Sequence, residues 1–155
     1  MDELETYVAD RLRDLMADLK SGDIDLAWES AADLMPMGPA AGPAVPALIE
    51  VLLDRRRTKF NFYARGMAAD ALGAIGPAAV ATIPALIDCT QPEPEMVEEG
   101  RWLRLRAAAA IFRISGEVQV ARQVAGELVD DPEWWLRDHA AKLLEKIQAS
   151  ESIEK

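Results

Sequence analysis

The sequence predicts an all-α fold, an α-solenoid of about four stacked helical hairpins with about eight helices. One reason is an internal repeat, since "LMPMGPAAGPAVPALIE" (34–50) lies over "LGAIGPAAVATIPALID" (72–88) at an offset of 38 residues. Gly38 coincides with Gly76, and Pro46 with Pro84. The other reason is an apolar stripe with helical spacing that recurs four times. Stacking copies of one helical unit buries such stripes in a continuous core.

Each stripe has small or apolar residues at its first, fifth, eighth, ninth and twelfth positions, as one buried helix face requires. The regular copies are Ala64, Ala68, Ala71, Leu72 and Ile75, then Leu103, Ala107, Ala110, Ile111 and Ile114, then Leu136, Ala140, Leu143, Leu144 and Ile147. The first copy is degraded, as expected for a terminal repeat, and has Leu26, Ser30, Asp33, Leu34 and Met37.

A second stripe follows each of the first three and completes a hairpin. Its members are Val45, Leu48, Ile49, Leu52 and Leu53, then Ile83, Leu86 and Ile87, then Ala121, Val124, Ala125, Leu128 and Val129. Gly-Pro between the stripes ends the first helix, because the residue before proline is pushed out of the helical region. Pro46 and Pro84 suit the first turn of the second helix.

We expect a single domain, 1–150, made of a capping helix, three repeats and a terminal half-repeat in that order. A helix from about Leu4 to Lys20 caps one end within 1–22, and the repeats occupy 23–57, 58–94 and 95–131. A terminal half-repeat at 132–150, helical from Pro132 to about Gln148, closes the other end. We expect the tail 151–155 to fray.

Three segments carry a family resemblance: "AADALGAIGPAAVATIPALID", "RLRAAAAIFRISG" and "WWLRDHAAKLLEKI". They resemble bacterial HEAT-like repeats, especially the short-helix kind of phycobilisome bilin lyases, over about residues 23–147. The resemblance implies the solenoid fold. It leaves function open, because the family includes scaffolds, inhibitors, chromophore lyases and DNA alkylation-repair glycosylases.

Composition limits the cellular setting and the partners. The chain has 155 residues, one cysteine, and 17 Lys plus Arg against 27 Asp plus Glu, for a net charge of -10. A lone cysteine forms no internal disulfide, and the charged start "MDELETYVADRLRD" is unlike a secretory signal. The sequence predicts a cytoplasmic protein without a membrane span or a nucleic-acid partner. Its oligomeric state stays open.

Few residues suggest catalysis. His139, the one histidine, falls at the edge of its stripe and is best interpreted as a partly buried structural residue. Cys89 falls at a half-exposed packing position. Metal-ligand spacings and cofactor-binding motifs are lacking, so we expect no catalytic residues, no metal and no cofactor.

Two charged loops fall one repeat apart. At the offset of 38 residues, Glu93 lies over Arg55 and Glu95 over Arg57. Ion pairs between these glutamates and arginines could join two neighbouring loops. Alternatively, the glutamates could contact a basic partner protein, and the sequence favours neither interpretation.

Aromatic and arginine residues recur together where successive helices begin. Arg65, Arg104 and Arg137 form a structural ladder that ties repeats together, with Tyr63, Trp102 and Trp135 each two residues earlier. Trp134 adjoins Trp135, and neighbours on a helix cannot both face the core, so one indole should be exposed. Aromatic side chains are typical anchors of protein interfaces.

Acidic residues recur on the second helices, where they predict a negative inner face: Glu50, Asp54, Asp88, Glu127 and Asp130. We therefore expect a non-enzymatic protein–protein interaction module, a scaffold or adaptor that binds a basic protein through this face and the aromatic edge. An inhibitor or immunity protein is a narrower version. The alternative is an enzyme or enzyme subunit, similar to bilin lyases or, less closely, to alkylation-repair glycosylases.

Overall fold

The computed structural model describes residues 2–92 and 97–153, and within them all regular secondary structure is helical, with no strand. The helices are α1 (Glu3–Lys20), α2 (Ile24–Leu34), α3 (Val45–Leu52), α4 (Lys59–Ile75), α5 (Ile83–Cys89), α6 (Glu98–Ser115), α7 (Gln119–Leu128) and α8 (Trp134–Ile153). Two 3₁₀ segments, η1 (Met35–Ala44) and η2 (Gly76–Thr82), connect α2 to α3 and α4 to α5. The all-α prediction is confirmed for these residues.

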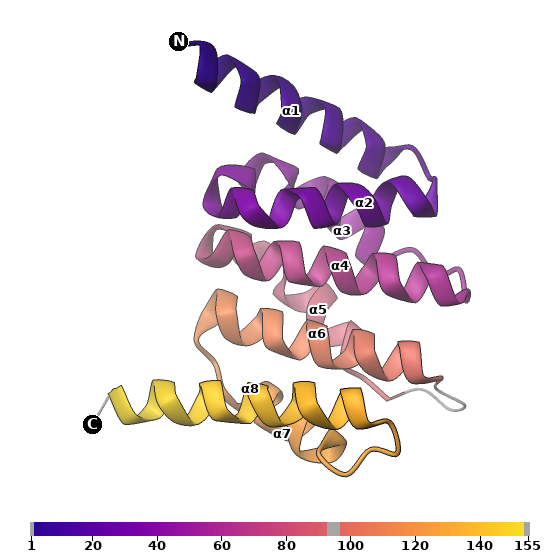
Figure 1. Cartoon of the computed structure of the whole chain (residues 1–155), viewed down its shortest axis with the longest axis vertical. Helices are drawn as coiled ribbons and strands as arrows, with labels where there is room; N and C mark the ends of the chain where they lie inside the picture. Colours follow the sequence, from indigo (N-terminus) through magenta and orange to yellow (C-terminus); the bar gives the residue numbers. More distant parts are fainter. Residues whose placement is uncertain (1, 93–96, 154–155) are drawn as a thin grey trace.

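The helices stack in chain order from α1 to α8 in two layers (Figure 1). The longer helices α2, α4, α6 and α8 form the front layer, and the short helices α3, α5 and α7 lie behind them. The glycines predicted to end the first helices lie at the turns, where Gly38 and Gly76 have φ of 55° and 82°. Glycine adopts such angles without the strain a Cβ would bring.

The core follows the two regular stripes closely. Every predicted stripe residue of α4 and α6 is buried, with Leu72 at the centre. The apolar side chains gather in two clusters, one from α1 to α6 and a smaller one among α6, α7 and α8. The α6 helix belongs to both clusters, because it turns Leu103 toward the first and Leu105 toward the second.

The stripe predicted for the first repeat is confirmed at Ser30 and Leu34, which are buried, and wrong at two of its other positions. Leu26 is 36% exposed, Asp33 is exposed, and Ala27 and Ala31 are buried as well. The neighbouring capping helix accounts for one of these differences, because Arg11 of α1 pairs with Asp33 at the surface with an N–O distance of 2.7 Å. The α2 helix also ends at Leu34, before Pro36, which leaves Met37 in the 3₁₀ segment.

Three further expectations need correction. Leu53 and Ile87 are 46% and 40% exposed, because they lie at the ends of short back helices that are covered on one side only. Cys89 is buried rather than half-exposed. The last helix runs past Gln148 to Ile153, held by an ion pair between Arg122 of α7 and Glu151, so the predicted fraying does not apply to 151–153.

One segment, Lys59–Cys89, is long and apolar enough to cross a membrane by length and composition, with a mean hydropathy of 1.6. The sequence pattern had predicted no membrane-spanning segment. The backbone interrupts the segment at Gly76, and 44% of its apolar window is buried within the stack. Arg65 and Asp70 also lie in it, both buried and both hydrogen-bonded. Its composition is that of the central helix of the stack.

Candidate functional site

The front helices expose one strip each, on the side away from the back layer. On α4, which is buried almost all round, the strip includes Tyr63 and Met67, and on α6 it includes Trp102 and Arg106. Spacings of three and four residues keep each strip on one helix face. We call the surface made by these strips of α2, α4, α6 and α8 the front face.

Aromatic rings form a row across the front face. Trp28 of α2 stacks on Phe60 and Tyr63 of α4, with ring centroids 6.4 and 5.8 Å apart. Tyr63 meets Trp102 of α6 edge to face at 5.4 Å. The sequence predicted that Tyr63 and Trp102 recur at one edge. It missed Trp28, because at the repeat offset of 38 this residue falls on Gly66 instead of on an aromatic.

The row depends on a close helix approach at Gly66. A Cβ placed on Gly66 would lie 2.1 Å from Cζ3 of Trp102, so the indole fills the space that a side chain would need. Trp102 is therefore only partly exposed, held between α4, Tyr63 and the Arg106 guanidinium, which lies 5.9 Å from the ring centroid. Its place in the row is rigid, which limits its use as an exposed anchor.

The indole pair on α8 divides as predicted. Trp134 is 69% exposed, which confirms that one of the two indoles lies at the surface. Trp135 is half-buried and packs edge to face against His139, with ring centroids 6.3 Å apart. Trp134 is thus the more accessible anchor, and Trp135 and Trp102 are the more enclosed ones.

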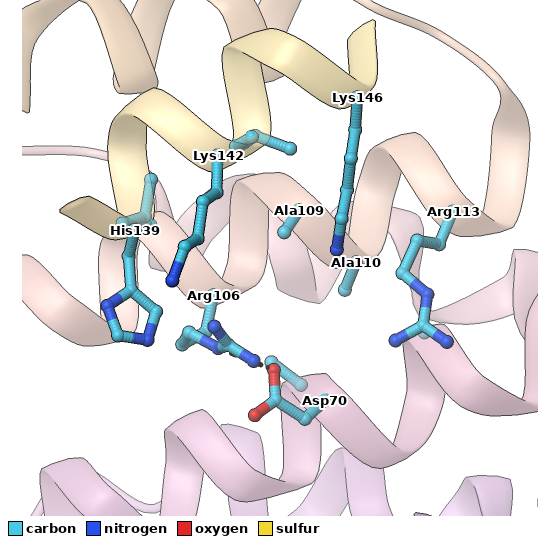
Figure 2. A pocket seen from close by; sticks show the side chains of 12 residues that line it. Asp70, Arg106, Ala109, Ala110, Arg113, His139, Lys142 and Lys146 are labelled. Carbon is cyan, nitrogen blue, oxygen red and sulfur yellow. Dashed lines mark hydrogen bonds and ion pairs between the residues drawn. The ribbon is translucent and has the colours of Figure 1, made fainter. Parts of the chain in front are cut away.

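An open groove with about 120 Å³ of accessible space lies beside the aromatic row and is lined by residues of α4, α6 and α8. Figure 2 shows side chains from the three helices pointing into it. The floor is made of small residues, among them Ala69, Gly73 and Ala110. Four cationic side chains and one carboxylate line the walls: Arg106, Arg113, Lys142, Lys146 and Asp70. The groove is therefore basic in a protein of net charge -10.

Asp70 lies under the groove and binds one of its cations. Nε of Arg106 donates to Oδ1 of Asp70 at 2.7 Å. Burial raises the pKa of the Asp70 carboxyl, and the hydrogen bond from Arg106 opposes that rise only in part. The carboxylate thus engages Arg106, whereas Arg113 and Lys146 make no hydrogen bond or ion pair with any residue of 2–92 or 97–153.

His139 lines the same groove. Its Nδ1 lies 2.7 Å from the carbonyl oxygen of Trp135, which can only accept, so Nδ1 carries a hydrogen and donates it. This bond fixes the ring and leaves Nε2 as the atom that a groove ligand could meet. The sequence interpretation of a partly buried histidine agrees with its half-buried position.

A repeat signal for the groove is present in the sequence. Arg106 and His139 are 33 positions apart, as are Arg113 and Lys146, and this is the offset between the last two stripes. Basic residues thus recur at equivalent positions of the last two repeats, as the aromatic residues do. The depth of the groove is not visible in that way, because it depends on how closely α8 approaches α6.

The three ladder arginines bind the ends of back helices. Nε of Arg65 donates to the carbonyl of Leu52 at the end of α3, at 2.9 Å, and Nε of Arg104 donates to that of Thr90 after α5. Nη1 of Arg137 donates to the carbonyl of Asp131, beyond the end of α7, at 2.8 Å. A cation at a helix C-terminus satisfies open carbonyls and complements the helix dipole.

The acidic residues of the back layer are largely engaged within the chain. Asp54 pairs with Arg56, Asp88 with Arg55 and Glu127 with Arg104. The hydrogen bonds from Arg56 and Arg104 lower the pKa of Asp54 and of Glu127. Glu50 and Asp130 are exposed and have no such partner among the described residues.

The predicted contact between the charged loops involves residues on two neighbouring repeats. Glu93 and Glu95 lie outside the described residues. Arg55 contacts the neighbouring repeat through Asp88 at the end of α5.

The described residues contain no group of three or more His, Cys, Asp or Glu that could hold a metal ion. Cys89 is buried, and burial raises the pKa of its thiol, although Arg65 lies 3.6 Å from the sulfur and opposes that effect. A thiol with a raised pKa is a poor nucleophile at neutral pH.

No protein-family model, curated protein or solved structure matches the chain. The resemblance to HEAT-like repeats therefore rests on the residues quoted above, and the site is interpreted from its own geometry.

Proposed function

We propose that the protein is a HEAT-like α-solenoid that works as a non-enzymatic module for binding another protein. The observation that carries this proposal is the front face, where an aromatic row across α2, α4 and α6 adjoins an open basic groove. Aromatic and arginine side chains are enriched among residues that dominate interface energies. A face assembled from the same positions of successive repeats suits an extended partner segment.

The back layer supports a second candidate, which is the predicted basic partner. Glu50 and Asp130 remain exposed there, yet Asp54, Asp88 and Glu127 are already paired with arginines of this chain. Their charges are partly neutralised, so this surface attracts a basic protein less strongly than the sequence alone indicates. We therefore place the main contact on the front face.

Site-specific photo-crosslinking in the native host separates the two surfaces. A benzoylphenylalanine replaces Phe60 or Lys142 on the front face, and Leu53 or Ile87 on the back layer, all four being exposed in the structure. We expect one protein to cross-link from both front positions and from neither back position, and Tyr63→Ala to reduce the yield from Phe60.

Other outcomes of this experiment count against the proposal. Cross-links from Leu53 and Ile87 alone would move the partner to the back layer. An absence of cross-links together with turnover by the purified protein, such as bilin attachment or release of an alkylated base, would establish the enzyme alternative instead.

A further inference from the structure

The groove between α4, α6 and α8 contains more cationic side chains than form ion pairs within the chain. Lys142 pairs with Asp138 on its own helix, at 2.8 Å, and Arg106 pairs with Asp70. Arg113 and Lys146 make no hydrogen bond or ion pair within the described part of the chain, although the charge of Arg113 acts on Asp70 and opposes the rise that burial causes in the pKa of that carboxyl. Four cationic side chains line the groove with only one carboxylate, so they repel one another, and a bound anion would relieve that repulsion.

The groove is also shaped for access to these cations. Gly73 lies beneath Arg113, and a Cβ at Gly73 would come within 3.3 Å of Cδ of that arginine. The small residues Ala109 and Ala110 continue the floor between the cationic walls. With about 120 Å³ of accessible space, the groove has room for several water molecules or for one small side-chain group.

The aromatic row makes the groove one end of a longer track. Arg106 joins the two, since its guanidinium contacts Asp70 on one side and the Trp102 ring on the other. Trp102 and Arg113 are 11 positions apart on α6, which corresponds to about 16 Å of helix. An extended peptide covers that length with about five residues.

We propose that this track binds an acidic peptide segment of the partner protein, with an apolar side chain against the aromatic row and a carboxylate or phosphate between Arg113 and Lys146. The proposal rests on the proposed function, because it names what the partner brings to the front face. A net charge of -10 repels polyanions such as nucleic acid at long range, whereas a short peptide with few charges meets mainly the local field of the groove.

The test is a nuclear magnetic resonance titration of the labelled full chain, read from the side-chain Nε–H signals of Arg113 and Arg106. The probes are three peptides of about five residues that share a leucine at one end and carry Glu, phosphoserine or Gln at the other positions. Inorganic phosphate and a short oligothymidylate are the further probes. We expect the Glu or phosphoserine peptide to shift the Arg113 signal and the Gln peptide to leave it unchanged.

The variant Arg113→Gln/Lys146→Gln should weaken that binding about tenfold or more, since it removes two charge-assisted contacts. The matched control is Arg13→Gln/Lys20→Gln, which makes the same charge change on α1, at the far end of the stack, and should leave affinity within about twofold. Circular dichroism of both variants verifies the fold.

Each remaining result overturns the inference. If the Glu and Gln peptides bind equally well, charge plays no role in recognition. If inorganic phosphate binds as tightly as the acidic peptides, the groove is a site for small anions only. Tighter binding of oligothymidylate makes the face a nucleic-acid site, and no binding of any probe at about 10 mM, well above the weakest affinities expected here, leaves the groove without this ligand. A front-face cross-link alongside failed titrations would retain the proposed function and reject only the acidic peptide.

Discussion

Leu72 lies at the centre of the stack with no exposed surface, in the middle of α4. Leu72→Ala should lower the free energy of unfolding by about 2 to 5 kcal/mol, because the deletion leaves a cavity that neighbouring helices cannot fill. Leu53→Ala is the matched control, since that leucine is largely solvated, and should cost less than about 1 kcal/mol. Urea denaturation measures both, and similar costs would contradict the assigned packing.

Gly66 permits the contact that anchors the aromatic row. Gly66→Ala should destabilise the protein by about 1 to 3 kcal/mol and shift its tryptophan fluorescence, because the added methyl displaces the Trp102 indole. Gly126→Ala is the control. No atom lies within 4 Å of the Cβ built on that helical glycine, so the change should stabilise by about 0.5 to 1 kcal/mol. An unaltered emission spectrum of Gly66→Ala would show that the indole does not occupy this space.

Asp70 should give the protein a distinctive pH dependence. Its folded-state pKa is raised above the usual 3.8, so the folded state holds this proton more tightly than the unfolded state does. The resulting stabilisation is complete below about pH 3.8 and is lost as pH rises through the raised value. Relative to Asp70→Asn, the wild-type protein should therefore lose unfolding free energy as the pH rises from about 3.8 through the raised folded-state pKa. Denaturation of both proteins across that range tests the sign, and an opposite trend would refute it.

At the scale of the elements, the ladder arginines connect the two layers. Arg104 is buried and reaches both Thr90 at the end of α5 and Glu127 of α7, the latter at 2.6 Å. Arg104→Met should cost about 2 to 3 kcal/mol, because it leaves the helix-end carbonyl unsatisfied in a buried site. Arg137→Met makes the same change at an exposed position and should cost less than about 1 kcal/mol. Thermal unfolding of the two variants compares them, and equal losses would argue against a role for burial.

The same scale shows what the sequence can predict. The stripes of α4 and α6 were predicted residue by residue, because each helix has a similar neighbour on both sides and the repeat pattern describes that environment. The pattern held only in part for α2, where Ser30 and Leu34 are buried but the neighbour α1, which is not a repeat, pairs Asp33 with Arg11 at the surface.

The candidate site was predictable only in part. Tyr63 and Trp102 follow the repeat, but Trp28 does not, because its equivalent in the next repeat is Gly66, and its stacking on Tyr63 is visible only in the structure. The acidic back residues were found by position, whereas their ion pairs with Arg55, Arg56 and Arg104 depend on side-chain paths that spacing does not describe.

At the scale of the whole molecule, the division of the core into two clusters predicts unequal local stability. The α7–α8 hairpin relies mainly on the smaller cluster and meets the larger one through α6 and the side chain of Val120. Amide hydrogen exchange should show α8 opening at a lower free energy than α4, whose amides should exchange only on global unfolding. The start of α1, where Leu4 and Tyr7 are exposed, should exchange fastest. Uniform protection across all helices would show that the stack opens as one unit.

The groove lies across the boundary between these clusters, since Asp70 comes from α4 and Lys146 from α8. Anything that binds there and needs both walls binds only while the hairpin is docked. Ligand and docking are then thermodynamically linked, and occupancy at 100 times the dissociation constant adds about 2.7 kcal/mol to the work of opening. Partner binding would thus suppress opening of the α7–α8 hairpin, the less stable part of the stack. The bound protein would then behave as one rigid body.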